Sequence, residues 1–122
     1  MSTPGKLART FFDAMNARDF IDLERHIAPD VVFDFPGPGA IDGSKRMLLF
    51  LKLLFRKYSR LVFTVQEVLA DAERACVVWT NEGHTAEGEP YRNRGVTFMR
   101  FSCSRIVCLS DYFKDTSFVK AG

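Results

Sequence analysis

The second half of the chain is a series of four strand-like segments, and this feature restricts the fold more than any other. The segments span residues 61–70, 74–86, 89–101 and 105–113, and short turns at 71–73, 87–88 and 103–104 join them. Turns of this length connect neighbouring strands that run antiparallel. Because helical patterns occupy the part of the chain before them, we expect an α+β domain and not a parallel α/β sheet.

Three helices and one strand are predicted before this series. Leu7, Phe11 and Met15 recur every fourth residue behind a Thr3-Pro4 start, which is typical of one helix face. Asp19 is placed to cap a second, short helix that Pro29 ends. A strand over 31–35, a loop over 36–39 rich in proline and glycine, and a long helix from about 44 to 58 complete the predicted elements.

Composition agrees with one soluble domain over residues 1–122. Apolar residues make up 47% and charged residues 26% of the chain, and a net charge of +2 is too small to imply a nucleic acid partner. Twelve phenylalanines accompany one tryptophan and three tyrosines. These rings either fill the core or line a cavity, and the sequence leaves both possibilities open.

The cysteines and the N-terminus favour a reducing, cytoplasmic location. Cys76, Cys103 and Cys108 lack the close spacing of a zinc site, so we expect free thiols and no metal. Residues 1–5 show no signal segment, and the longest apolar run, residues 47–51, is too short to span a membrane.

Five segments carry a family resemblance: Phe12–Asp19, Ala28–Phe33, Gly43, Tyr91–Thr97 and Arg105–Phe113. With these segments in this order, the chain resembles the nuclear transport factor two-like superfamily, which includes SnoaL-like polyketide cyclases and ketosteroid isomerase. The resemblance implies a cone-shaped half-barrel, in which a curved, mixed, mainly antiparallel sheet wraps around three N-terminal helices. It also implies a deep pocket and a homodimer.

The lengths of the turns predict which side chains face that pocket. A two-residue turn at Glu87-Gly88 would pair Ala86 with Glu89 and thereby turn alternate residues from Val78 to His84 to one face. A three-residue turn at 103–105 would set Thr97 opposite Asp111 on the same face. The resemblance implies that this face is the concave one.

Asp111 is the predicted catalytic residue. A carboxyl among apolar side chains is costly to ionise, so we expect the pKa of Asp111 to rise towards the range that suits proton transfer. The alternative is that Asp111 is solvated near the open end of its strand. The predicted polar pocket residues are Asn93, Glu82, His84, Thr97, Thr80 and Tyr58. For Glu82 and His84 the alternative is a place at the rim, beside the hairpin tip. The predicted apolar ones are Phe11, Met15, Phe33, Phe35, Leu54, Phe55, Val78, Met99, Leu109 and Phe113.

Two specific activities within the superfamily are not supported. In the comparison with ketosteroid isomerase, Phe11, Phe35 and Thr97 fall where the oxyanion tyrosine, the base and the second acid are expected. Limonene epoxide hydrolase matches at Asp111, but its arginine and second aspartate have no counterpart, and Phe33 and Phe35 replace its water-holding tyrosine and asparagine.

We therefore expect a cofactor-independent isomerase, cyclase or lyase that acts on a hydrophobic polyketide-, terpenoid- or steroid-like molecule by acid–base catalysis at Asp111. The first alternative is a domain that binds a small ligand without catalysis, because a fold does not fix a function. The second is an interaction module that uses the outer face of the sheet or the exposed Leu49 and Leu53 of the long helix. The cations around these two leucines are interpreted as a solvated helix face and not as a nucleic acid site. Trp79 is expected on the outer face, where a large aromatic ring needs cover and favours a homodimer.

Overall fold

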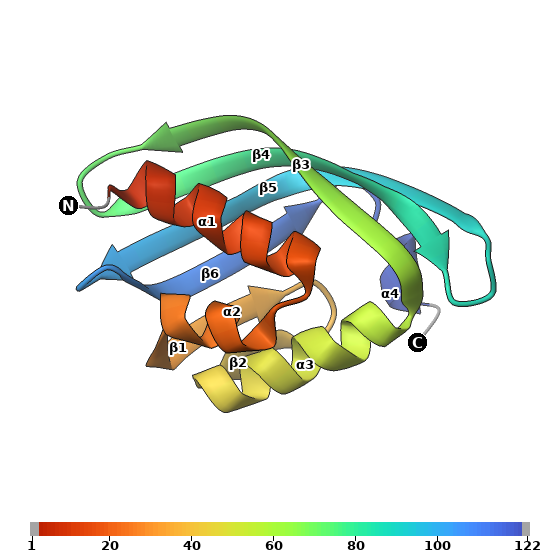
Figure 1. The fold of residues 1–122 in the computed structure, drawn as a ribbon, viewed down its shortest axis with the longest axis horizontal. Coiled ribbons are helices and arrows are strands. Elements are labelled where there is room, and N and C mark those ends of the chain that lie inside the picture. The colour runs from red at the N-terminus through yellow and green to blue at the C-terminus, as the bar shows by residue number, and fades with distance from the viewer. Residues whose placement is uncertain (1–2, 121–122) are drawn as a thin grey trace.

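Three helices cover one face of a six-stranded sheet in the computed structural model, which describes residues 3–120 (Figure 1). The three covering helices are α1 (Pro4–Ala17), α2 (Phe20–His26) and α3 (Ser44–Arg56), and a short fourth helix, α4 (Ser117–Lys120), follows the last strand. The strands are β1 (Ile27–Phe35), β2 (Gly39–Asp42), β3 (Tyr58–Ala70), β4 (Arg74–Thr85), β5 (Pro90–Ser102) and β6 (Arg105–Phe113). The predicted α+β class and the helix-first order are confirmed.

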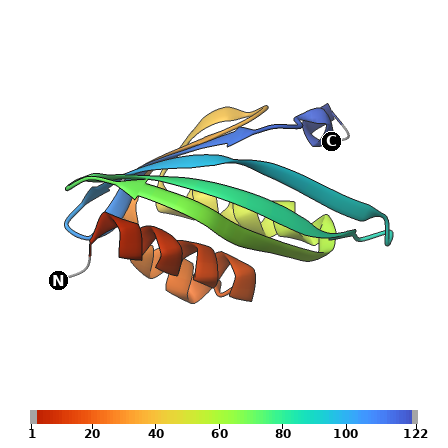
Figure 2. The ribbon, with the colours of Figure 1, turned by 90° about the horizontal axis from the view of Figure 1, so that it is seen from above.

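The sheet is mixed, curved and unclosed. Its strand order is β2-β1-β6-β5-β4-β3, and β1 runs parallel to β6 while all other neighbours are antiparallel. Helix α3 contacts β1 and β2 at one end of this order and β3 at the other, which only a curved sheet allows. Figure 2 shows the sheet edge-on with α1 and α2 beneath it. Within residues 3–120, no helix combines the length and the apolar character needed to cross a membrane.

The first two helices begin as the sequence predicts. The side chain of Thr3 accepts a hydrogen bond from the amide of Lys6, and Pro4 occupies the first turn of α1. Arg18 ends α1 in the left-handed conformation with φ of 52°. Asp19 then accepts from the amide of Asp22 at 3.0 Å and caps α2.

The region around β1 differs from the prediction in two ways. Pro29 does not terminate α2 but lies inside β1, where the pairing with β6 skips between Ile27 and Val32, so its missing N–H interrupts no ladder. The segment 36–39 was expected to be a loop only, yet it leads into β2, which forms a hairpin with β1. Gly37 and Gly39 adopt positive φ angles of 102° and 78° and make this tight reversal possible.

The predicted register between β4 and β5 is wrong by one residue. The hairpin loop has three residues instead of two, because the backbone amide of Thr85 donates to the carbonyl oxygen of Glu89 at 2.8 Å. Gly88, the last residue of the loop, adopts a φ of 89°. A one-residue shift exchanges the two faces of β4. The helix-covered face therefore carries Val77, Trp79 and Asn81. The four residues predicted for it lie on the outer face: Val78, Thr80, Glu82 and His84.

The predicted pairing of Thr97 with Asp111 is confirmed, although the turn was wrong. Cys103 and Ser104 form a two-residue turn with φ angles of 51° and 62°. By itself this turn would shift β6 by one residue relative to the prediction. A bulge between Arg100 and Phe101 compensates the shift and restores Thr97 opposite Asp111.

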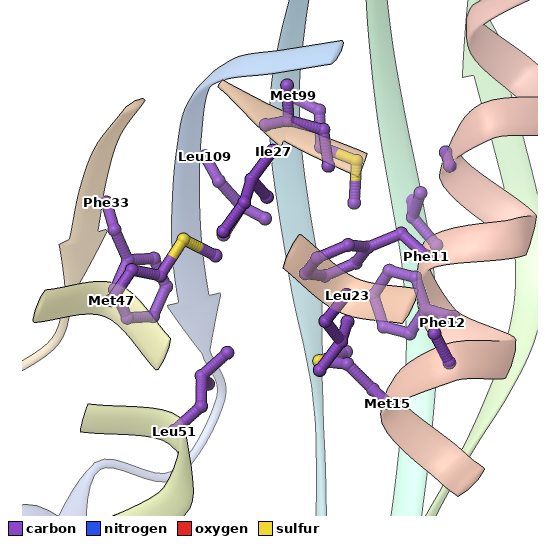
Figure 3. Close-up of a cluster of buried hydrophobic side chains, with 14 of the residues drawn as sticks. Phe11, Phe12, Met15, Leu23, Ile27, Phe33, Met47, Leu51, Met99 and Leu109 are labelled. Atoms are coloured by element: carbon purple, nitrogen blue, oxygen red, sulfur yellow. The ribbon is translucent and has the colours of Figure 1, made fainter. Parts of the chain in front are cut away.

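Trp79 lies in the core and not on the outer face. Only 1% of its surface is exposed, and its ring packs edge-on against Phe63 at 5.1 Å and Phe113 at 5.0 Å between centroids. The argument for a homodimer that started from an exposed Trp79 is therefore wrong, and the homodimer implied by the family resemblance stays a prediction. Figure 3 shows the adjoining part of the core, in which side chains of α1, α2, α3, β1, β5 and β6 meet.

Gly95 provides the space that the Trp79 ring occupies. It is the pairing partner of Trp79 on β5, and a Cβ at this position would collide with the carbonyl oxygen of Tyr112. The same Cβ would come within 2.8 Å of the Trp79 ring. Glycine is thus required here for close approach and not for its backbone angle.

We expect Gly95→Ala to lower the free energy of unfolding by about 2–3 kcal/mol, because backbone and ring must both move to admit a methyl group. Gly5→Ala, in α1, is the matched control, since its new methyl would find only ordinary contacts at 3.8 Å with Val68 and Ala70 of β3. That change should leave stability equal or raise it by up to about 1 kcal/mol through helix propensity. Urea unfolding measures both variants, and equal stability of the two would contradict the close approach at Gly95.

Candidate functional site

The strongest candidate site surrounds the carboxyl of Asp111 on the helix-covered face of β6. Thr97, its partner on β5, donates a hydrogen bond from Oγ1 to Oδ1 of Asp111 at 2.6 Å. The indole Nε1 of Trp79 in turn donates to Oγ1 of Thr97 at 2.8 Å. Three neighbouring strands therefore contribute one side chain each to a continuous hydrogen-bonded chain that ends at the carboxyl.

A cavity of about 20 Å³ adjoins Asp111. Apart from Asp111 and Thr97, its lining is apolar and comes from α1, α3, β1 and β6: Phe11, Phe12, Met15, Phe33, Met47, Leu51 and Leu109. Figure 3 shows most of these apolar side chains converging from both sides of the core. The space suffices for about one water molecule. The deep pocket that the family resemblance implies is therefore not present at Asp111 in this structure.

Aromatic packing explains why the cavity is small. Phe33, which lines the cavity, packs against two rings of a larger group, since its centroid lies 5.7 Å from those of Phe35 and Phe50. This group, here called the aromatic cluster, consists of Phe35, Phe50, Phe113 and Phe118. The centroids of Phe35 and Phe50 lie 4.9 Å apart, as do those of Phe113 and Phe118, and Phe35 and Phe113 are 5.4 Å apart. Phe35 and Phe113 are predicted to line a pocket, but they pack against each other and do not border the cavity.

The surroundings of Asp111 favour its neutral form. Burial raises the pKa of Asp111 to about 7, and the negative charge of Asp34 on the neighbouring strand raises it further. The hydrogen bond from Thr97 acts in the opposite direction, because it stabilises the carboxylate. Asp111 retains some accessible surface and lines the cavity, yet the protein around it is dense enough for burial to dominate. At neutral pH both protonation states are therefore populated.

Asn93 and Tyr58 lie in a separate polar layer at the other side of Trp79. The amide of Asn93 is engaged with the backbone of Asp115, at 2.7 and 3.1 Å, and with the hydroxyl of Tyr91 at 3.1 Å. Tyr58 packs against Tyr91, and burial raises the pKa of both phenols. Asn81 faces Asn93 across the ladder, and its Oδ1 is buried without a hydrogen-bond partner among the described residues.

The other predicted pocket residues are distributed over the core and the outer surface. Met99 is fully buried, Phe55 packs against Phe20, and Leu54 is half-buried. Thr80 and Glu82 line an open groove of about 610 Å³ on the outer face of the sheet. His84 lines a neighbouring groove, and Val78 is half-buried on the same face. These four β4 residues therefore do not belong to the Asp111 site.

Sequence reasoning missed Trp79, Phe12, Met47 and Leu51 as parts of the site. Met47 and Leu51 belong to the apolar face of α3, but the helical spacing of apolar residues does not distinguish a cavity wall from the core. The signal for Trp79 was Gly95, because an isolated glycine inside a strand indicates close approach of another group. No group of three metal-binding side chains occurs in the part of the chain from residue 3 to 120.

Comparison with known proteins identifies the family. The model of the SnoaL-like domain matches residues 8–109. No functionally curated protein matches the chain. A protein from Pseudomonas putida KT2440 that carries the name polyketide cyclase has 23% identity and a TM-score of 0.88, with 98% of each chain covered.

Two further solved structures have the same fold. An NTF2-like protein of unknown function from Burkholderia pseudomallei K96243 has 22% identity and a TM-score of 0.87, over 98% of this chain and 97% of that one. TerC, crystallised with polyporic acid, has 17% identity and a TM-score of 0.83, over 97% of both chains. Identities this low establish the fold and not the activity. Because the domain model matches residues 8–109, most of this chain, the chain belongs to the SnoaL-like family, and it has the NTF2-like fold.

Proposed function

We propose that the protein is a cofactor-independent enzyme that moves a proton on a hydrophobic small molecule bound over Asp111. The observation that carries this proposal is a single carboxyl with a pKa of about 7 among apolar side chains. A general acid–base group is most effective when its pKa lies near the working pH. The isomerase, cyclase and lyase reactions all fit, because each can proceed by removing a proton from one atom and returning it to another.

The names of fold relatives support the class of substrate. One relative carries the name polyketide cyclase, and another was crystallised with polyporic acid. For this chain we propose a polyketide-, terpenoid- or steroid-like molecule, because the wall around Asp111 offers rings and aliphatic groups and few polar partners. Asp111 would act as the base in its ionised form and as the acid after it has taken the proton.

Binding of such a molecule requires the cavity wall to move, since about 20 Å³ accommodates only one water. The proposed route is through the aromatic cluster, which contacts the wall residue Phe33. Phe118 is the member of the aromatic cluster that lies on α4, which has four residues and is shorter than the elements that carry the other three rings. Its ring contacts Phe113 at 4.9 Å, Phe35 at 6.1 Å and Tyr91 at 6.4 Å. Displacing α4 would remove one wall of the cluster without breaking a strand pairing.

A non-catalytic ligand-binding domain is the second candidate. The composition of the cavity wall favours it, because Asp111 and Thr97 are joined there by apolar residues alone and no second acid or base among residues 3–120 lines the space. The two candidates differ in one measurable property. An enzyme of the proposed kind exchanges a substrate proton with solvent, whereas a binding domain does not.

We expect the wild-type protein to catalyse deuterium incorporation next to the carbonyl of a ketone from a panel of aromatic polyketides, terpenoids and steroids in D₂O. Asp111→Asn should lower that rate by about 100-fold or more, because the side chain loses its titratable proton and keeps its shape. Asp13→Asn, on the exposed side of α1, is the control and should retain the rate. Mass spectrometry reads the exchange. Equal rates in all three proteins would exclude Asp111, and binding without exchange would favour the second candidate.

The stability of the wild-type protein should fall as pH rises from about 4 to about 7. The unfolded carboxyl ionises at a pKa near 3.8, whereas native Asp111 keeps its proton until about 7. Above that pH, Asp111 is ionised in both the folded and the unfolded protein, so the free energy of unfolding falls no further. Asp111→Asn should lack this loss and gain up to about 4 kcal/mol relative to wild type at pH 8. Urea unfolding across pH measures it, and curves for Asp111→Asn and Asp13→Asn that run parallel to wild type would contradict the raised pKa.

Phe118→Ala should open the cluster and increase the binding of an apolar fluorescent dye on the order of tenfold, because a larger fraction of molecules is competent to bind. Phe98→Ala is the matched control. It removes the same ring from the outer face, where the Arg100 guanidinium lies 5.6 Å from the Phe98 centroid. Unchanged dye binding in Phe118→Ala would show that α4 does not limit access.

A further inference from the structure

We propose that Trp79 and Thr97 are positioning residues that hold Oδ1 of Asp111 as a permanent hydrogen-bond acceptor, so that Oδ2 is the oxygen that gains and loses the proton. This inference rests on the proposed function for its significance, because it names the oxygen that would face the substrate. The geometry that carries it is the chain from the Trp79 indole through the Thr97 hydroxyl to Asp111.

The donor and acceptor in each of these two hydrogen bonds follow from the chemistry of the indole. An indole N–H donates and never accepts, so Oγ1 of Thr97 is the acceptor in the 2.8 Å contact with Trp79. The hydroxyl has one proton, and with the indole on one side that proton points to Oδ1 of Asp111, 2.6 Å away. Only 1% of Trp79 and 2% of Thr97 is exposed, so water does not compete for these groups.

Packing holds the indole in the orientation that this chain needs. Thr97 pairs with Val77, so Trp79 reaches it diagonally across the ladder. The absence of a side chain at Gly95 lets the ring lie across β5. Phe63 and Phe113 then contact the indole from β3 and β6, at 5.1 and 5.0 Å between centroids. A threonine hydroxyl that would otherwise rotate freely is therefore fixed by a rigid donor.

No other titratable side chain lines the cavity at Asp111 among the described residues. The groups that face it from α1, α3 and β1 are apolar, and Thr97 is the polar group from β5. The charge of Asp34 on β1 raises the pKa of Asp111. Ionisation of Asp111 strengthens the hydrogen bond from Thr97, and through it the polarisation of the Trp79 N–H. The indole should therefore report the protonation state of Asp111.

Trp79 is the only tryptophan of the chain, so one indole N–H resonance can be followed without assignment. In ¹⁵N-labelled wild-type protein we expect this resonance to shift with pH at the same midpoint as the Asp111 carboxyl carbon. Asp111→Asn should abolish the shift. Thr97→Val should abolish it as well, while Asp111 still titrates at a pKa raised by about one pH unit through loss of the hydrogen bond. Thr97→Ser keeps the hydroxyl and should behave as wild type.

A double-mutant cycle separates positioning from simple burial. Trp79→Phe should raise the pKa of Asp111 when Thr97 is present, because the freed hydroxyl no longer points to Oδ1 in every molecule. In the Thr97→Val background the same change should have no further effect. A purely structural role of Trp79 would instead alter the pKa equally in both backgrounds.

Three results would overturn the proposal. These are an indole shift that survives Thr97→Val, an indole that does not follow the titration of Asp111 in wild type, and equal effects of Trp79→Phe in the two backgrounds. The first two need no Trp79 variant, so a poorly folded Trp79→Phe would not prevent the test. None of these measurements uses turnover. A failure of the proposed catalysis would therefore appear as proton exchange that persists in Asp111→Asn, independently of the positioning by Trp79 and Thr97.

Discussion

The close contact between the Trp79 ring and the backbone of Gly95 determines how the inner face of the sheet is filled. Because Gly95 has no side chain, the indole lies across β5 and divides the inner face into two regions. On one side are Thr97 and Asp111, which the indole N–H reaches through one hydroxyl. On the other side is the polar layer of Asn81 and Asn93. The same ring therefore fills volume, separates two polar groups of residues and orients one of them.

The sequence predicted the class and order of elements because these depend on local patterns. Alternation and capping residues indicated where most helices and strands begin, with β2 the exception, since four residues carry too little pattern. Face assignments depend instead on the length of each loop. One extra residue in the loop before Glu89 turned Val78, Thr80, Glu82 and His84 outwards. The sequence does not settle the loop length, because a glycine at position 88 suits both a two-residue and a three-residue turn.

The Asp111 site was predictable in its polar pair and not in its volume. Thr97 and Asp111 met as expected only because a bulge at Arg100 and Phe101 compensated an error of one residue in the turn. The size of the cavity follows from how rings interlock, and twelve phenylalanines can either line a space or fill it. The sequence does not encode that choice in any local pattern. In this structure Phe35 and Phe113 pack against each other, with centroids 5.4 Å apart.

The proposed opening of the aromatic cluster would link the packing of the core to the protonation of Asp111. Burial is the main cause of the raised pKa of Asp111, so the closed arrangement stabilises the neutral acid. Linkage is reciprocal, and ionisation must therefore favour any arrangement that brings water or a polar group to the carboxylate. A hydrophobic ligand that enters and excludes water again would restore the neutral form or supply the proton itself. If α4 moves as proposed, the packing of Phe118 against Phe113 affects both access to the site and the protonation state of Asp111.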